Sequence, residues 1–280
     1  MEVFIRNKRY TGPVQSVVLD WAGTAVDHGC IAPAAVFVDV FAQRDVAVTI
    51  EEARKFMGLA KKDHIRGMIG LPRVAAAWEE KYGRGPDETD VDSLYDRTAT
   101  LMLESIANHC DPIEGVVETI DDLRGQGVKI GSCTGYVDEM IEVLVPRAKE
   151  KGYHPDAIVC SSDVPAGRPY PWMCYANAIR LETYPMEAMV KVGDTIADIQ
   201  EGLNAGMWTV GITRTGNELG LTSQEVAELA PEALNLRLET IRNRFKAAGA
   251  HFILDSTADL LPVIGEINQR LKSGELPLNG

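Results

Sequence analysis

The sequence lacks paired cysteines and long apolar runs. Its five cysteines are odd in number, widely scattered and without a CxxC pair, which argues against a disulfide framework or a zinc site. No run of about 18 apolar residues is present to cross a membrane. The start, MEVFIRNKRY, has no apolar signal-peptide core. We therefore expect a cytoplasmic protein with reduced cysteines and no membrane partner.

Positive charge is also scarce. The chain has 28 Lys and Arg against 41 Asp and Glu, a net charge of -13, which disfavours a surface for nucleic acid or anionic membranes. An anionic substrate would need local positive charge. The 280 residues can form a full hydrophobic core, as one large domain or two modest ones.

Apolar runs alternate with helical patterns along the chain. The runs expected to be strands are 17–19, 128–133, 157–160, 189–192, 208–212 and 251–255. Strands separated by helices imply a mostly parallel sheet covered on both faces. The predicted fold class is therefore α/β, with a Rossmann-like, doubly wound parallel sheet.

The interval between Thr24 and Val128 is far longer than the dozen or so residues that a crossover between parallel strands needs. Helical patterns occur within it at 34–44, 60–69, 74–82 and 91–109. We predict an inserted α-helical cap domain at residues 29–110. Residues 1–28 and 111–280 form the predicted core, which the helical segment 113–124 rejoins.

Polar side chains follow several predicted strands. Asp20, Thr134 and Asp194 each come directly after a strand, and Arg168 lies in the loop after another. Since ligands of open parallel sheets bind at the carboxyl ends of the strands, these side chains are candidates for one site. Asp20 could be a nucleophile or a metal ligand. Taken alone, it could equally cap a helix.

Asp194 and Asp198 are four positions apart and project from one face of a predicted helix. Together with Asp20 they make an oxygen-ligand magnesium site plausible. The alternative for this pair alone is two solvated acids at a helix start.

The constellation resembles the haloacid dehalogenase superfamily, and within it the phosphonatase family. The resemblance rests on motifs spread over nearly the whole chain: DWAGTAVDHGC, MGLAKKDH, GSCTGY, DVPAGRPYPWMCY and VGDTIADIQEGLNAGMW. It implies an aspartyl nucleophile at Asp20, phosphoryl-binding Thr134 and Arg168, and a Mg²⁺ site at Asp194. The implied activity is hydrolysis of the phosphorus–carbon bond of phosphonoacetaldehyde, through a lysine Schiff base and an aspartyl phosphate.

Ala22 departs from the general superfamily pattern. Phosphatases of the superfamily usually carry a second aspartate there to protonate an oxygen leaving group. A carbon leaving group instead needs an electron sink, which an imine supplies. The resemblance places the metal between Asp20, Asp194 and the Ala22 carbonyl, with Asp198 supporting these ligands without touching the metal.

Helical phase favours Lys61 over Lys62 as the imine lysine. Lys61 shares a face with His64 and Ile65. Lys62 pairs with Arg66. Most lysines are solvated, and this would be the expectation for Lys61 without further information. The resemblance changes it, because the motif MGLAKKDH places the imine lysine of the family on Lys61.

The remaining candidates depend mainly on the resemblance. His64 could relay protons, or could be a structural histidine. Arg168 could bind an anion, or lie free in a surface loop, and Thr134 could be a helix cap. The expected substrate-binding residues, each of which could instead serve packing, are Cys30, Met57, Gly58, Gly135 and Tyr136.

Two rival functions remain. The first is another enzyme on the same scaffold, a phosphate-ester phosphatase or a carbon–halogen hydrolase. The second is a non-catalytic binding protein, which the presence of Asp20, Lys61 and Asp194 argues against. The resemblance also implies a homodimer formed through the cap helices and a small-molecule phosphonate as the partner.

Overall fold

The computed structural model, which describes residues 9–277, contains one six-stranded, fully parallel sheet. The strand order is β3-β2-β1-β4-β5-β6. The strands are β1 (Ser16–Leu19), β2 (Lys129–Thr134), β3 (Ala157–Cys160), β4 (Met189–Gly193), β5 (Trp208–Ile212) and β6 (Phe252–Leu254). This order is that of doubly wound sheets, and it confirms the predicted fold class.

The strands are apolar because helices cover both faces of the sheet. Every residue of β1, β4 and β5 is buried, as expected for central parallel strands. The core helices are α6 (Val116–Gly125), α7 (Asp138–Glu150), α8 (Trp172–Arg180), α9 (Ile196–Ala205), α10 (Ser223–Glu228), α11 (Pro231–Ala247) and α12 (Leu260–Lys272). Helices α6, α7 and α12 share one hydrophobic cluster with Val17 and Leu19, whereas α8 packs on the other face with Val18.

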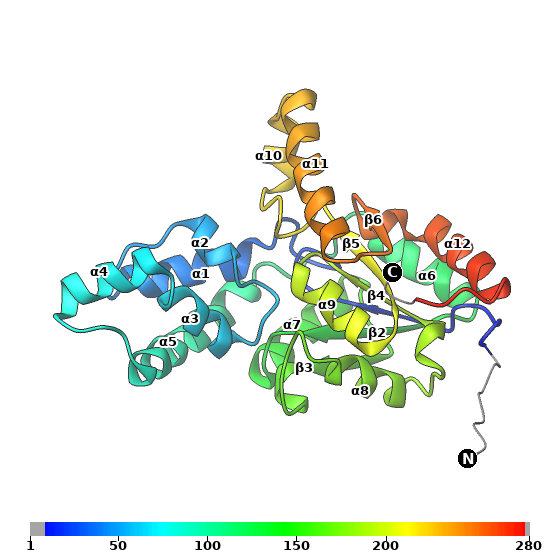
Figure 1. Cartoon of the computed structure of the whole chain (residues 1–280), viewed down its shortest axis with the longest axis horizontal. Coiled ribbons are helices and arrows are strands. Elements are labelled where there is room, and N and C mark those ends of the chain that lie inside the picture. The colour runs from blue at the N-terminus through cyan, green and yellow to red at the C-terminus, as the bar shows by residue number, and fades with distance from the viewer. Residues whose placement is uncertain (1–8, 278–280) are drawn as a thin grey trace, which may run out of the picture.

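The long interval after β1 forms a group of helices beside the sheet (Figure 1, left). These helices are α1 (Ile31–Ala42), α2 (Ile50–Arg54), α3 (Lys61–Ile69), α4 (Pro72–Tyr82) and α5 (Glu88–Ile106). Helices α1 and α3 both pack on the long α5. The predicted insertion of a helical cap is therefore confirmed, while the boundaries at residues 29 and 110 stay a prediction.

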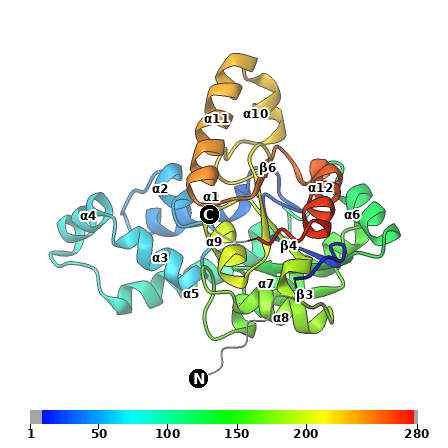
Figure 2. The same ribbon diagram turned by 45° about the vertical axis from the view of Figure 1, so that its right-hand side comes forward.

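Some elements differ from the sequence-based expectation. Helix α2 was not predicted; it is five residues long and begins with a capping box between Thr49 and Glu52. The expected strand 251–255 is ordered as a strand only at Phe252–Leu254. Helix α11 was not singled out either, and with α10 it forms an arm that projects from the sheet (Figure 2). None of the helices in the described part of the chain is long and apolar enough to span a membrane.

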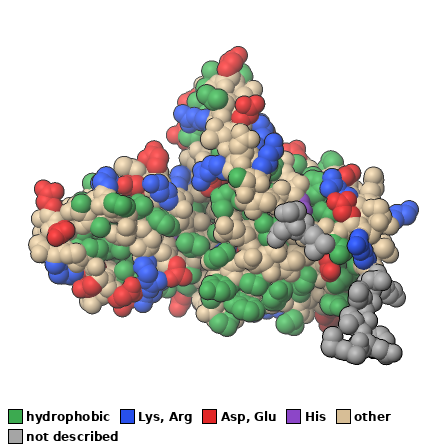
Figure 3. Space-filling view, viewed as in Figure 1, with side chains coloured by type: hydrophobic (Ala, Val, Ile, Leu, Met, Phe, Trp, Pro, Cys, Tyr) green, Lys and Arg blue, Asp and Glu red, His purple; other side chains and the backbone are tan. Residues whose placement is uncertain are grey.

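The surface carries acidic and basic side chains in mixed distribution on the face shown in Figure 3. Hydrophobic side chains gather over the region of α8 in the same view. Exposed large hydrophobic residues there include Trp172, Ile179 and Tyr184.

Candidate active site

The site begins where β1 ends. The Asp20 amide donates to the Val192 carbonyl at 3.0 Å, so this aspartate lies beside the end of β4. The chain then turns at Gly23, whose φ is +82° and whose absent Cβ would lie 2.2 Å from Asp194 Oδ2. Only glycine permits both this backbone conformation and this approach. The turn thus brings the carboxylates after β1 and β4 together.

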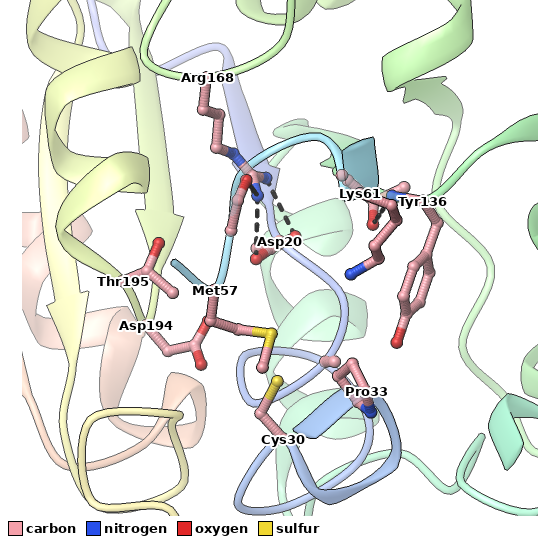
Figure 4. Close-up of a pocket in the computed structure, with 13 residues that line it drawn as sticks. Asp20, Cys30, Pro33, Met57, Lys61, Tyr136, Arg168, Asp194 and Thr195 are labelled. Carbon is pink, nitrogen blue, oxygen red and sulfur yellow. Dashed lines mark hydrogen bonds and ion pairs between the residues drawn. The ribbon is translucent and has the colours of Figure 1, made fainter. Parts of the chain in front are cut away.

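A small cavity of about 20 Å³ lies at this edge of the sheet, under the cap (Figure 4). Its lining residues are Asp20, Ala22, Cys30, Pro33, Met57, Gly58, Lys61, Thr134, Gly135, Tyr136, Arg168, Asp194 and Thr195. Every predicted site residue except His64 and Asp198 therefore lines this cavity. Pro33 and Thr195 are additions that the sequence analysis missed.

Three buried carboxylates form an acidic cluster, because Asp20, Asp194 and Asp198 have oxygens within 4.8 Å of one another. Burial raises the pKa of Asp20 and of Asp194. Neighbouring carboxylates raise the pKa of Asp194 further, whereas at Asp20 the lowering by Arg168 is larger than the raising by Asp198. Asp194 accepts from the Thr24 hydroxyl at 3.0 Å and from the Asn217 amide at 2.7 Å. These bonds fix the orientation of its carboxylate.

Arg168 is the main cation beside this cluster. Its guanidinium donates to both oxygens of Asp20, at 3.0 and 3.3 Å. It also lies 3.1 Å from Asp198 Oδ1 and donates through Nε to Glu201 Oε2 at 2.9 Å. Burial opposes the charge, but Asp198 and Asp20 raise the pKa of Arg168 well above its usual value. Arg168 is thus a permanently charged group at an anion-accepting position.

Asp198 supports the site from behind the cavity wall. Its Oδ1 accepts from Lys191 Nζ at 2.5 Å, and its Oδ2 accepts from the Thr195 hydroxyl at 2.5 Å. Burial alone would raise the pKa of Asp198, but Arg168 and Lys191 together hold it below its usual value. Asp198 is therefore an ionised, fully paired carboxylate that does not line the cavity.

Lys61 points into the cavity, where its amine faces Tyr136 (Figure 4). The side chain is 4% exposed, and Nζ lies 4.7 Å from the Tyr136 ring centroid and 5.6 Å from that of Phe37. Burial lowers the pKa of Lys61 to about 8. Lys62, by contrast, is exposed and pairs with Asp92. The two lysines take the orientations that the helical phase predicts.

His64 lies outside the cavity lining. Its ring stacks on Phe37 at 3.8 Å between centroids, and Nε2 lies 2.7 Å from the Ala53 carbonyl oxygen. Burial and then the nearby Lys61 lower the pKa of His64 well below its usual value. His64 is a neutral imidazole packed beneath the lysine, and a proton relay through it stays a prediction.

The cap and core loops meet directly over the cavity. The Gly58 carbonyl accepts from Arg168 at 3.1 Å, and a Cβ on Gly58 would lie 2.5 Å from Thr195 Oγ1. On the opposite side a Cβ on Gly135 would lie 2.5 Å from the Leu59 carbonyl oxygen. Glycine at both positions lets the cap loop approach the core closely enough to exclude water.

The sequence analysis also missed the charged residues that hold Arg168 and Asp198. Glu201 and Lys191 are both fully buried and lie 3.6 Å apart in the same ion-pair network. Glu201 follows Asp198 by three positions within a quoted motif, so helical spacing was an available signal. Lys191 sits inside an apolar strand, where nothing in the sequence marks its partner.

The acidic cluster fits a metal ion. Asp20 and Asp194 offer oxygens from two neighbouring strand ends, and Ala22 lines the same cavity. Oxygen donors of this kind suit a hard divalent cation. Their raised pKa values come first from burial and then from neighbouring carboxylates, and a bound cation would favour the ionised forms of both.

Comparisons with known proteins identify the family of the chain. A family model of haloacid dehalogenase-like hydrolases matches residues 19–212. A phosphonoacetaldehyde hydrolase of Syntrophobacter fumaroxidans is 53% identical over 277 residues, covering 99% of this chain and 100% of the relative. A phosphonoacetaldehyde hydrolase-like protein of the same organism is 56% identical over the same shares. The crystal structure of a phosphonoacetaldehyde hydrolase-like protein from Oleispira antarctica has a TM-score of 0.96 and 40% identity, covering 99% of this chain and 100% of that one.

Proposed function

The chain belongs to the haloacid dehalogenase-like hydrolase family, and on that premise we propose that it hydrolyses the phosphorus–carbon bond of phosphonoacetaldehyde to acetaldehyde and phosphate. Relatives about 50% identical over the full length carry that activity in their names. The observation that carries the proposal is Lys61, a buried amine with a pKa of about 8 in the same cavity as Asp20. An amine of this kind can condense with an aldehyde.

The proposed reaction starts with the Lys61 amine. Its pKa of about 8 leaves a useful neutral fraction near neutral pH. The neutral amine adds to the substrate aldehyde and water leaves, which gives a protonated imine. Asp20 then attacks phosphorus, the phosphorus–carbon bond breaks, and its electron pair moves into the imine to form an enamine.

The second half of the proposed reaction returns Lys61 and Asp20 to their starting forms. Protonation of the enamine carbon and hydrolysis of the imine release acetaldehyde and free Lys61. Water hydrolyses the aspartyl phosphate and restores Asp20. Ala22 stands where a second aspartate would protonate an oxygen leaving group, so an ester has no acid at that position. His64, which is buried on the same helix as Lys61, is the proposed proton relay.

Arg168 and Thr134 are proposed to receive the phosphonate oxygens. The Arg168 guanidinium already contacts both oxygens of Asp20, so an anion bound there lies close to the attacking carboxylate. Gly135 and Tyr136 form the wall beside Thr134, and the buried Tyr136 ring is 4% exposed.

The remaining wall, formed by Cys30, Met57 and Gly58, comes from the cap and its linker. A cavity of about 20 Å³ holds about one water molecule. The cap must therefore open to admit a phosphonate and close again for reaction.

We propose Mg²⁺ as the metal, held by Asp20, Asp194 and the Ala22 carbonyl. When bound, it would supply positive charge to the phosphoryl oxygens as they approach Asp20. Asp198 keeps its place behind the ligands through Lys191 and Thr195.

The remaining features of the proposal concern the whole molecule. We propose a core of residues 1–28 and 111–280, of which the structure describes 9–28 and 111–277, and a cap of residues 29–110. We further propose a homodimer formed through the cap helices, where Ile50 and Tyr82 are each 39% exposed. The five free cysteines fit a reducing cytoplasmic compartment.

The test compares phosphate release from phosphonoacetaldehyde with release from a panel of phosphate esters. Borohydride added with phosphonoacetaldehyde should reduce the imine and inactivate the protein, leaving an adduct on Lys61 that peptide mass spectrometry can locate. Lys61→Arg keeps the charge but cannot form an imine, so it should bind phosphate without cleaving substrate. Lys62→Arg is the matched control. Faster release from an ester, unaffected by Lys61→Arg, would instead identify a phosphate-ester phosphatase.

A further inference from the structure

Arg54, the last residue of α2, makes hydrogen bonds outside its own helix. Nη1 donates to the carbonyl oxygens of Gly29 at 2.9 Å and Cys30 at 3.2 Å, which lie in the linker that leads into α1. Nη2 donates to the Gly220 carbonyl at 3.1 Å, in the loop after β5. One cap side chain therefore binds both the linker and the core.

Asn217 connects Arg54 to the acidic cluster. Its Oδ1 accepts from Arg54 Nη1 at 3.1 Å, and its Nδ2 donates to the Arg54 carbonyl at 3.3 Å. Asn217 is only 2% exposed, so the Asn217 side of this reciprocal pair is buried. Its backbone amide donates to Asp194 Oδ2 at 2.7 Å. A continuous chain of hydrogen bonds thus runs from α2 to Asp194.

The backbone on the core side is shaped around Arg54. Gly220 has a φ of +66°, and a Cβ there would lie 2.6 Å from Arg54 Nε. Gly29 has a φ of +86°, and its amide donates to the Thr215 carbonyl at 2.7 Å. A Cβ on Gly29 would lie 2.3 Å from the Leu221 carbonyl oxygen. Two glycines in left-handed conformations let the linker and the loop close tightly around the guanidinium.

We propose that Arg54 is a positioning residue that couples the seating of the cap on the core to the metal-binding geometry of Asp194, through Asn217. Arg54 does not line the cavity and touches no reacting group. It holds the Asn217 side chain, and this fixes the loop whose backbone amide orients the Asp194 carboxylate. The inference rests on the proposed function only in taking Asp194 as a metal ligand.

The coupling acts in both directions. If a seated cap strengthens metal binding by some factor, then metal binding strengthens the seating of the cap by the same factor. Residues that orient metal ligands from behind typically change metal affinity by about 10- to 100-fold when they are substituted. We expect Arg54→Gln to weaken binding of Mn²⁺, used as a spectroscopic probe, about tenfold.

The experiment titrates the full chain with Mn²⁺ and follows the paramagnetic resonance signal of the free ion, without substrate. Arg54→Lys keeps the charge and most of the stem but not the fork of donors, so it should weaken Mn²⁺ binding as well. The matched control is Arg73→Gln. Arg73 is another cap arginine, and it donates to Glu52 at 2.7 Å and the Ala47 carbonyl at 2.9 Å, both within the cap.

A double-mutant cycle with Asn217→Ala tests whether Arg54 acts on Asp194 through Asn217. If Arg54 acts through Asn217, the double variant should bind Mn²⁺ about as weakly as either single variant. Hydrogen exchange of the amides at 215–221 should also speed up in Arg54→Gln and stay unchanged in Arg73→Gln.

Three outcomes would overturn the inference: wild-type Mn²⁺ affinity in Arg54→Gln, equal weakening in Arg73→Gln, or effects of Arg54→Gln and Asn217→Ala that add in full. If the unsubstituted protein binds no Mn²⁺, the inference falls together with the metal site. The Mn²⁺ titration contains no substrate, so its result does not depend on the reaction that the protein catalyses. If the protein failed to cleave phosphonoacetaldehyde, the proposed function would be overturned, but the inference about Arg54 would stand.

Discussion

Lys61→Met is expected to stabilise the protein while abolishing its proposed reaction. The Lys61 side chain is 4% exposed, and burial lowers its pKa from 10.5 to about 8. At pH 7 the amine is still mostly protonated, so the folded chain keeps a cation in a place that favours the neutral form. The difference between the two pKa values corresponds to about 3 kcal/mol of lost stability.

The stability that Lys61→Met gains by removing the buried cation is partly offset by lost contacts. The Lys61 ammonium lies 4.7 Å from the Tyr136 ring centroid and 5.6 Å from that of Phe37, and such contacts contribute about 0.5–2 kcal/mol. Methionine loses them but keeps a flexible apolar stem in the same space. We therefore expect the free energy of unfolding to rise by about 1–2 kcal/mol at pH 7.

The pH dependence of the free energy of unfolding shows whether the buried charge of Lys61 causes the difference in stability. Between pH 8 and 10.5 the unfolded chain holds the Lys61 proton and the folded chain does not, so the unsubstituted protein gains stability as pH rises. The advantage of Lys61→Met should therefore shrink over this range. Below pH 8 both states carry the proton, and the advantage should be constant.

Urea unfolding measures this difference in the free energy of unfolding. It is followed by circular dichroism at pH 7 and again at about pH 9.5. Lys62→Met is the matched control, because Lys62 is exposed and pairs with Asp92. Its loss should change stability by at most about 1 kcal/mol, in the destabilising direction. An unfolding midpoint of Lys61→Met at or below that of the unsubstituted protein at pH 7 would refute the reasoning. So would an advantage that persists undiminished at pH 9.5.

Two further predictions concern the site. The rate at which borohydride traps the Lys61 imine should rise with pH and level off above about pH 8, where the amine is neutral; a rate independent of pH between 6 and 8 would contradict the lowered pKa. Gly23→Ala should reduce activity at least about tenfold, because its Cβ would lie 2.2 Å from Asp194 Oδ2. Gly85→Ala, with no atom within 4 Å of its Cβ, should leave activity unchanged, and equal losses in both variants would exclude the contact with Asp194 as the cause.

Local sequence features predicted much of the fold and most of the cavity. Apolar runs that end in polar residues mark parallel strands, and the carboxyl ends of such strands meet at one sheet edge. This rule alone brings Asp20, Thr134 and Asp194 together. The 3.6-residue helical period separates Lys61 from Lys62 because the two neighbours project about 100° apart.

Features that depend on distant partners could not be predicted in the same way. Lys191 lies in an apolar strand, and its carboxylate partner Asp198 is reached only once α9 packs on β4. Nothing in the sequence distinguishes Arg54 from a surface arginine, but it contacts Asn217, 163 positions away. His64 shares the helix face of Lys61 yet stacks on Phe37, because helical phase places a side chain on a face and does not choose its neighbour.

The buried charges of the core side of the site do not balance by themselves. The carboxylates there belong to Asp20, Asp194, Asp198 and Glu201, and the cations belong to Arg168 and Lys191. Lys61 is mostly protonated at pH 7 but must give up its proton to react, so it supplies no compensating charge during the reaction. When all four carboxylates are ionised, two negative charges then remain in a buried place, and the raised pKa values of Asp20 and Asp194 reflect how unfavourable that ionisation is. A divalent cation cancels both charges and a monovalent cation cancels only one, so the electrostatics of this chain favour a divalent ion at Asp20 and Asp194.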